Sequence, residues 1–246
     1  ESALPRRLKC LLWGAALACL ACTQGRPPEG VWRPLAGERT DRIPGPINIQ
    51  GFGPFESFPK ALDATCSLIL SRPNATVGHI KDVEVALRSA TEYCAWLYYT
   101  PAGQYEFSML TDLEVPGDHL QGNASCLLPW HVDDPRYSPD NIKYLFYIHS
   151  HALAGELSDR DIRLAVEMAN VHGWVAETGD GQVPVAVIAF FSNSTDGDNP
   201  SCDGAYQYIP ATRELLRWNR RAGAWARERV GMVIWRGSAS FSIQRE

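Results

Sequence analysis

The chain has 246 residues, of which 45% are hydrophobic, 21% charged and 10% aromatic. These fractions are typical of a globular protein and exclude a disordered or collagen-like chain. The formal net charge is −5. Because an acidic protein repels polyanions, we expect no nucleic-acid partner.

The N-terminus has the pattern of an export signal. A basic segment, residues 6–9, precedes an apolar run at residues 10–22. Thirteen residues are too few to cross a bilayer, which needs about 20 in a helix. We therefore predict a signal peptide at residues 1–25 and a protein that is secreted or held at the cell envelope. The end of the run also resembles a bacterial lipobox, in which a lipidated Cys19 or Cys22 would attach the protein to the membrane. A buried helix is the alternative, although no amphipathic period supports it.

Residues 26–57 are rich in proline and glycine and are predicted to form a linker or an extended arm. Seven of the 17 prolines lie between positions 27 and 59, which rules out a helix there. The apolar residues Ile47, Phe52 and Phe58 indicate that the later part packs on the domain. We assign residues 58–246 to that single domain.

Four cysteines follow the predicted signal: Cys66, Cys94, Cys126 and Cys202. An even number in an exported chain is compatible with two disulfides, for which three pairings are open. These four form no C-x-x-C pair, so a structural zinc site made of thiolates has no support.

Helical and strand patterns alternate irregularly along the domain, which predicts an α/β fold with a mixed β-sheet flanked by helices. Helices are predicted at residues 58–71 and 158–172. The remaining patterns predict strands at 83–87, 93–99, 104–110 and 142–151, a hairpin of 174–177 with 183–191, and a strand-rich C-terminal extension with strands at 206–209, 215–218 and 230–235.

Two histidines and an aspartate are the candidate metal ligands. His149 and His151 are two apart at the end of the best central strand, so both side chains project from one face. Asp161 lies in the first turn of the following helix, which Ser158 caps. Two imidazoles and one carboxylate form a usual ligand set of a catalytic zinc, Zn²⁺. Such a site also needs a carboxylate that is not a ligand as general base, and Glu92 is the candidate.

Each of these features also has a simpler explanation. Ser158-x-x-Asp161 fits a variant capping box, and two histidines on a strand face can be ordinary polar positions. Their combination, with a glycine-containing loop between strand and helix, favours metal binding.

The pattern from Glu92 through His149-Ser-His151 to Ser158-x-x-Asp161 resembles the JAMM (MPN+) metallopeptidase family, over residues 58–191. The chain as a whole is also similar to a group of exported myxobacterial proteins of this type. The resemblance implies a JAMM/MPN-like domain in which His149, His151 and Asp161 bind zinc, Glu92 activates water and Ser158 stabilises the oxyanion.

The chain departs from the family pattern at three places. Ala95 replaces a usual glycine, Ala152 replaces the proline that usually follows the second histidine, and six residues instead of seven separate His151 from Ser158. The shorter loop bears on whether Asp161 reaches the metal. Glu156, within that loop, is the alternative carboxylate.

Other chemistries fit less well. Metallo-β-lactamase-like hydrolases need His-x-His-x-Asp-His, but Leu153 and Ala154 stand at the last two positions. Phosphoesterases of the polymerase-and-histidinol-phosphatase type use a barrel for which the domain is short, and no Gly-x-Ser-x-Gly elbow supports a serine hydrolase. We therefore predict an exported zinc-dependent hydrolase that cleaves a peptide, isopeptide or amide bond in a peptide, protein or cell-wall substrate. The alternative is a non-catalytic exported lipoprotein that uses a JAMM-like fold as a binding module.

Six arginines and two tryptophans lie close together in the C-terminal region, between positions 213 and 229. Such a cluster could bind an anionic polymer or an acidic tail. We interpret it instead as an exposed hairpin face on which arginine stems cover Trp218 and Trp225.

Overall fold

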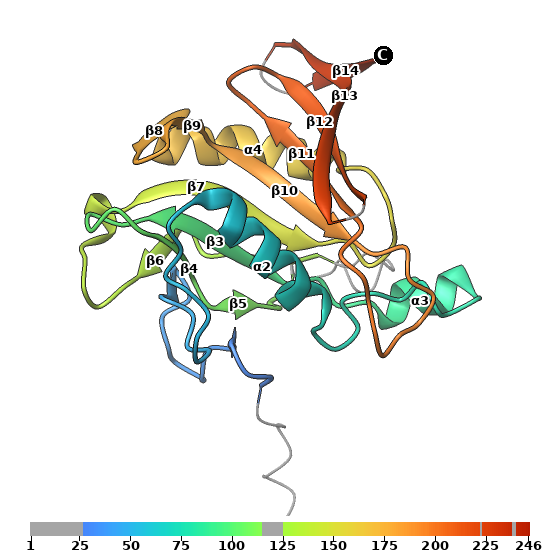
Figure 1. The fold of residues 1–246 in the computed structure, drawn as a ribbon, viewed down its shortest axis with the longest axis horizontal. Helices are drawn as coiled ribbons and strands as arrows, with labels where there is room; N and C mark the ends of the chain where they lie inside the picture. The colour runs from blue at the N-terminus through green and yellow to red at the C-terminus, as the bar shows by residue number, and fades with distance from the viewer. Residues whose placement is uncertain (1–26, 115–124, 222, 238–239) are drawn as a thin grey trace, which may run out of the picture.

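A computed structural model describes residues 27–114, 125–221, 223–237 and 240–246 (Figure 1). The predicted signal peptide and the lipidation candidates Cys19 and Cys22 lie outside the described residues. Among the described helices, none is long and apolar enough to cross a membrane.

A ten-stranded mixed sheet forms the centre of the molecule (Figure 1). The strand at its middle, β7, runs parallel to β10 and antiparallel to β3. The strands in spatial order are β1 (Val31–Trp32), β5 (Leu110–Thr111), β3 (Cys94–Tyr99), β7 (Lys143–Ser150), β10 (Ala186–Phe191), β11 (Gly204–Ile209), β12 (Glu214–Arg221), β13 (Ala224–Arg236) and β14 (Ser240–Arg245), with β4 (Tyr105–Phe107) paired to β3. The predicted α/β class and the central position of the strand that carries the histidines are confirmed.

Two long helices cover opposite faces of this sheet. Along β7, Phe146 and Ile148 belong to the hydrophobic cluster that includes residues of α2 (Phe58–Leu70). Tyr147 belongs to the other cluster, with residues of α4 (Asp159–His172). Because side chains alternate along a strand, His149 shares the α4 face with Tyr147. Both helices were predicted from the sequence within one residue of their observed ends.

The arm packs against the domain instead of extending away from it. β1 pairs in parallel with β5, and β2 (Arg42–Pro44) pairs with β6 (His131–Asp133) in a small second sheet. The short 3-10 helix η4 (Pro139–Asn141) precedes β7. Ile47 is buried in the core with residues of α2, which confirms that the later part of the arm packs on the domain.

Three predicted elements differ from the structure. The strand predicted at residues 104–110 is divided into β4 and β5, which pair separately with β3. Residues Val83–Ser89 form a helix, α3, and not a strand. The Asp82 side chain caps this helix by accepting hydrogen bonds from the amides of Glu84 and Val85, and Val83 and Val85 are exposed, so no sheet buries them.

The predicted hairpin of residues 174–177 and 183–191 is also divided. β8 (Val175–Thr178) pairs only with β9 (Gly181–Pro184) in a separate two-stranded sheet, and β10 then enters the main sheet. Pro184, whose nitrogen cannot donate a ladder hydrogen bond, lies at the change of sheet. The strand β14, at the C-terminal edge of the main sheet, was not predicted.

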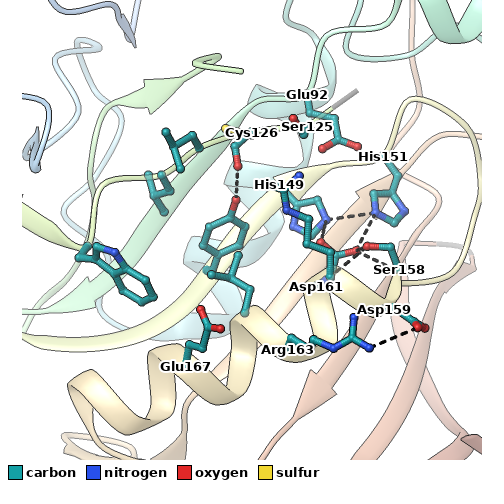
Figure 2. A pocket seen from close by; sticks show the side chains of 16 residues that line it. Glu92, Ser125, Cys126, His149, His151, Ser158, Asp159, Asp161, Arg163 and Glu167 are labelled. Atoms are coloured by element: carbon teal, nitrogen blue, oxygen red, sulfur yellow. Dashed lines mark hydrogen bonds and ion pairs between the residues drawn. The ribbon is translucent and has the colours of Figure 1, made fainter. Parts of the chain in front are cut away.

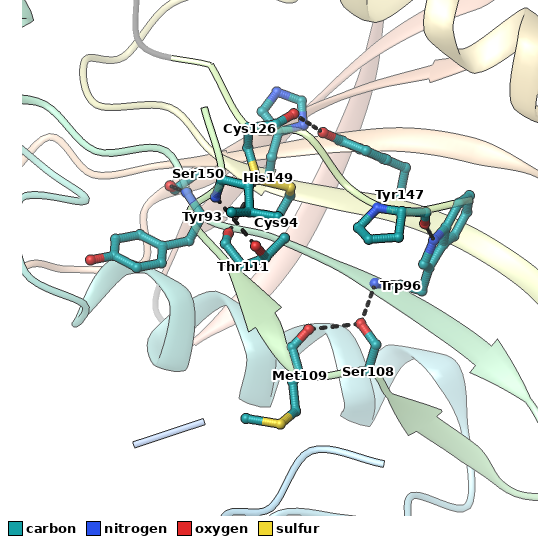
Figure 3. Close-up of a disulfide and its surroundings, with 12 residues drawn as sticks. Tyr93, Cys94, Trp96, Ser108, Met109, Thr111, Cys126, Tyr147, His149 and Ser150 are labelled. Atoms are coloured by element: carbon teal, nitrogen blue, oxygen red, sulfur yellow. Dashed lines mark hydrogen bonds between the residues drawn. A yellow bond between two sulfur atoms is a disulfide. The ribbon is translucent and has the colours of Figure 1, made fainter. Parts of the chain in front are cut away.

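The four cysteines form two disulfides. Cys66 of α2 is bonded to Cys202, ahead of β11, and Cys94 of β3 is bonded to Cys126 (Figure 3). Disulfides persist in oxidising compartments, so both bonds are consistent with an exported protein.

Candidate metal centre

The end of β7 presents both histidines to the same space. His149 is the second-last residue of β7 and lies opposite Cys94 of β3. The pairing continues past the end of the ladder, since the Ser150 amide donates to the Tyr93 carbonyl at 3.0 Å. Glu92 therefore lies at the head of β3 beside His151 (Figure 2).

Three donor atoms from these elements converge. The Nε2 atoms of His149 and His151 are 3.1 Å apart. The Nε2 of His149 is 3.6 Å from Asp161 Oδ1, and that of His151 is 3.8 Å from Asp161 Oδ2 (Figure 2). In a tetrahedral zinc site with ligand bonds of 2.0–2.1 Å, neighbouring ligand atoms are about 3.3–3.4 Å apart. The described residues can therefore hold a metal ion.

Hydrogen bonding supports the same arrangement. The Nδ1 of His151 lies 3.0 Å from the carbonyl oxygen of Gly155. A carbonyl only accepts, so Nδ1 carries the hydrogen, and when the ring is neutral its lone pair is at Nε2. That lone pair faces the Nε2 of His149. A hydrogen on the Nε2 of His149, or a cation, can lie between the two nitrogens.

Burial and charge set the protonation states at neutral pH. His149 is 2% exposed, and burial lowers its pKa to about 4. Burial also lowers the pKa of His151, but the hydrogen bond and negative charge of Asp161 outweigh it, so that pKa is raised. Burial raises the pKa of Asp161, and the two imidazoles with the Ser158 hydrogen bond more than offset it, so that pKa is lowered. The site thus combines a neutral His149 with an ionised carboxylate.

The capping box that the sequence suggested is present at the start of α4. The Ser158 hydroxyl accepts from the Asp161 amide, and the Ser158 amide donates to Asp161 Oδ2 at 2.7 Å. The Ser158 hydroxyl is also 2.7 Å from the same oxygen. Asp161 Oδ1 faces His149. The cap therefore fixes the carboxylate in the orientation that faces the two imidazoles.

The three departures from the family pattern do not separate the candidate ligands His149, His151 and Asp161. The six-residue loop is folded back by the His151–Gly155 hydrogen bond, and the Ala152 carbonyl accepts from the Val77 amide at 3.0 Å. Ala95 belongs to the cluster on the α2 face, away from the site. Glu156, the alternative carboxylate, is paired with Arg245 of β14 and is absent from the described lining of the cavity.

A cavity of about 790 Å³ contains the site. Glu92 and Ser158 line this cavity together with the three candidate ligands. The electrostatic influence of Glu92 extends to His151, whose pKa it raises. The structure thus brings all five predicted site residues to one cavity.

One wall of this cavity could not be found from the sequence. It is formed by residues 125–128 and Trp130, which the Cys94–Cys126 disulfide joins to β3 beside His149 (Figure 3). The buried Tyr147 hydroxyl donates to the Cys126 carbonyl at 2.9 Å, and the Tyr147 ring packs edge-on against His149, with 5.5 Å between the ring centroids. The even cysteine count was the available signal, but it left the pairing open.

No protein-family model, curated protein or solved structure matches the chain. The fold and the site therefore define an α/β protein with a candidate metal centre, and its function rests on the geometry described above.

Proposed function

We propose that the protein is an exported zinc-dependent hydrolase of JAMM type that cleaves a peptide, isopeptide or amide bond. The observation that carries the proposal is the convergence of three ligand atoms, from His149, His151 and Asp161, at separations suited to one tetrahedral ion. The Glu92 carboxylate, in the same cavity, supplies the group that a metal-dependent hydrolase needs beyond its ligands.

Zinc at this site would act as a Lewis acid and bring the pKa of a bound water to about 7. Glu92 takes a proton from the attacking water and delivers it to the nitrogen of the leaving amine. The Ser158 hydroxyl, which points at Asp161 Oδ2 in the free site, turns to donate a hydrogen bond to the developing oxyanion. The Ser158 cap and the His151–Gly155 hydrogen bond hold the ligands in place before substrate arrives.

The substrate class follows from the cavity and the compartment. A space of about 790 Å³ lies within the range of about 300–1,000 Å³ that is typical of ligand-binding cavities. Two disulfides indicate an oxidising compartment, where proteins, peptides and cell-wall components supply amide bonds. We propose these as substrates.

Metal analysis tests the ligand set directly. The purified protein is expected to hold one zinc ion per chain, and His149→Ala and His151→Ala are each expected to lose it while they retain the cooperative unfolding of the apo protein. Zinc that stays bound in both variants would disprove the assignment.

The role of Glu92 is tested by comparing two carboxylates. Glu92→Gln is expected to keep zinc but to lose hydrolysis of a casein or peptidoglycan substrate by at least about a hundredfold, the usual contribution of a general base. Glu156→Gln is the matched control, because Glu156 faces Arg245 outside the cavity. A folded protein that holds no zinc and ignores chelators would favour the non-catalytic binding module instead.

A further inference from the structure

A second cavity, on the opposite face of the sheet from the metal centre, has a different character. It measures about 250 Å³ and is lined by residues of α2, β7, β10, β11, β12 and β13. Phe146 and Ile188 line it from the sheet, and both belong to the cluster on the α2 face. His149 faces the other side with α4, so the sheet separates the two cavities.

The lining of this apolar cavity is almost entirely hydrocarbon. Among the described residues that line it, Gln207 contributes a polar amide side chain. The remaining lining residues are apolar or aromatic: Phe58, Pro59, Leu62, Phe146, Ile188, Phe190, Ala205, Trp218 and Trp225.

The two indole nitrogens and the amide oxygen of Gln207 are engaged with neighbours. The Trp218 indole donates to Gln207 Oε1 at 2.8 Å, and the Trp225 indole donates to Asp63 Oδ1 at 3.2 Å. Both tryptophans therefore leave mainly carbon surface for an occupant, and the cavity selects for apolar groups.

Positive charge lies next to the same two tryptophans. The Arg227 guanidinium is 5.9 Å from the ring centroid of Trp218, and the Arg220 guanidinium is 5.7 Å from that of Trp225. Arg220 also pairs with Asp63 at 2.9 Å, whereas Arg227 is exposed. An occupant with an apolar body and an anionic end would satisfy both features.

The volume limits the size of the occupant. A cavity of about 150 Å³ holds one benzene ring, so 250 Å³ accommodates roughly ten carbon atoms by the same ratio. This is below the range of about 300–1,000 Å³ that encloses a drug-sized molecule. A single medium-length chain therefore fits, and a two-chain lipid does not.

We propose that this apolar cavity binds the alkyl chain of a free, medium-chain carboxylate, with Arg227 beside the carboxylate. The site is independent of the metal centre and of the hydrolase function. It belongs to α2, β7 and the strands β10–β13, whose aromatic side chains form much of its wall.

Binding of saturated carboxylates from hexanoate to tetradecanoate tests the proposal, by calorimetry and tryptophan fluorescence below the micelle concentration. The affinity is expected to rise about fourfold with each added methylene and to level off near decanoate, where the cavity is full. Absence of saturable binding, or a rise that continues without levelling, would overturn it.

Cavity-filling variants locate the bound chain. Leu62→Trp is expected to weaken decanoate about fifteenfold, which is the loss of two buried methylenes. Leu68→Trp is the matched control on the same helix, outside the cavity lining, and is expected to bind as the parent does. Equal binding by the Leu62 variant, or loss of decanoate binding in His149→Ala, would place the ligand elsewhere and overturn the proposal.

Charge variants and vesicles identify the head group and the source of the chain. Arg227→Gln is expected to weaken decanoate two- to fivefold without affecting decanol. Arg229→Gln is the control, because Arg229 pairs with Glu246 and Glu214. Equal weakening of decanol, or co-sedimentation with phosphatidylglycerol vesicles without decanoate binding, would contradict a free carboxylate ligand.

Discussion

Removing the Cys94–Cys126 disulfide is expected to weaken the metal site as well as the fold, because this bond ties the cavity wall to the strand beside His149. The two cysteines are 32 residues apart in sequence. The loop-entropy relation gives about 4 kcal/mol of stabilisation for such a loop. Cys66–Cys202 spans 136 residues, for which the same relation gives about 5 kcal/mol.

The two bonds differ in their relation to the site. Cys94 lies opposite His149, and the Cys126 carbonyl accepts the hydrogen bond from Tyr147. Cys66 is buried in the cluster on the α2 face. We therefore expect Cys94→Ala/Cys126→Ala to bind zinc about tenfold more weakly, as loss of groups behind a metal ligand commonly does. Cys66→Ala/Cys202→Ala is expected to lose more stability and keep the parent zinc affinity.

Urea unfolding of the metal-free proteins measures the stability, and competition with a chromogenic chelator measures the zinc affinity. If a double variant does not fold, Tyr147→Phe provides the same test, because it removes only the hydrogen bond to the Cys126 carbonyl. An equal loss of zinc affinity in both double variants would show that the effect is global. Unchanged affinity after loss of Cys94–Cys126, and in Tyr147→Phe, would refute the role of the wall.

Three further predictions concern single residues. Ser158→Ala is expected to cost about 1 kcal/mol of stability through loss of the helix cap and to lower the zinc affinity several-fold. Ser158→Thr is expected to keep the parent stability and zinc affinity. Urea unfolding and chelator competition measure the two quantities. Burial lowers the pKa of His172 to about 4, whereas a histidine in the unfolded chain has a pKa of about 6.5. The free energy of unfolding is therefore highest above about pH 6.5 and declines as the pH falls from there towards 4. Urea unfolding across this range should show a shallower decline in His172→Gln. Tyr98→Phe removes the hydrogen bond to the buried Asp134 carboxylate, 2.9 Å away, and is expected to cost about 1.5–3 kcal/mol in denaturant unfolding without changing zinc affinity.

The elements that could be predicted are those in which the spacing of apolar residues and the capping or turn residues indicate the same structure. The period of two along β7 placed His149 and His151 on one face, and Ser158 marked the start of α4. The strand predicted at residues 83–87 is wrong because a short apolar run fits a strand or a helix, and the cap by Asp82 decides for the helix. Local pattern therefore predicts where a side chain points within its element, and it fails where a single cap decides the element.

Long-range features could not be predicted for a different reason. Four cysteines allow three pairings, and the bond between Cys94 and Cys126 depends on how the segment that contains Cys126 returns to the start of β3. The position of Glu92 beside His151 depends likewise on the register between β3 and β7. Candidate ligands that lie within one strand–loop–helix unit were therefore accessible to sequence reasoning, whereas the cavity that surrounds them was not.

The capping box and the metal ligand set, which compete as explanations of Ser158 and Asp161 in the sequence, are compatible in the structure. The cap uses Asp161 Oδ2, which accepts from the Ser158 amide, and Oδ1 faces His149. A helix cap alone accounts for the carboxylate at this position but not for two imidazole nitrogens 3.1 Å apart in front of it. A hydrogen on one of the two nitrogens, or a cation, can lie between them. The observation that favours a metal is therefore the convergence of both imidazoles with the Asp161 carboxylate, and the cap explains how the third ligand is held beside them.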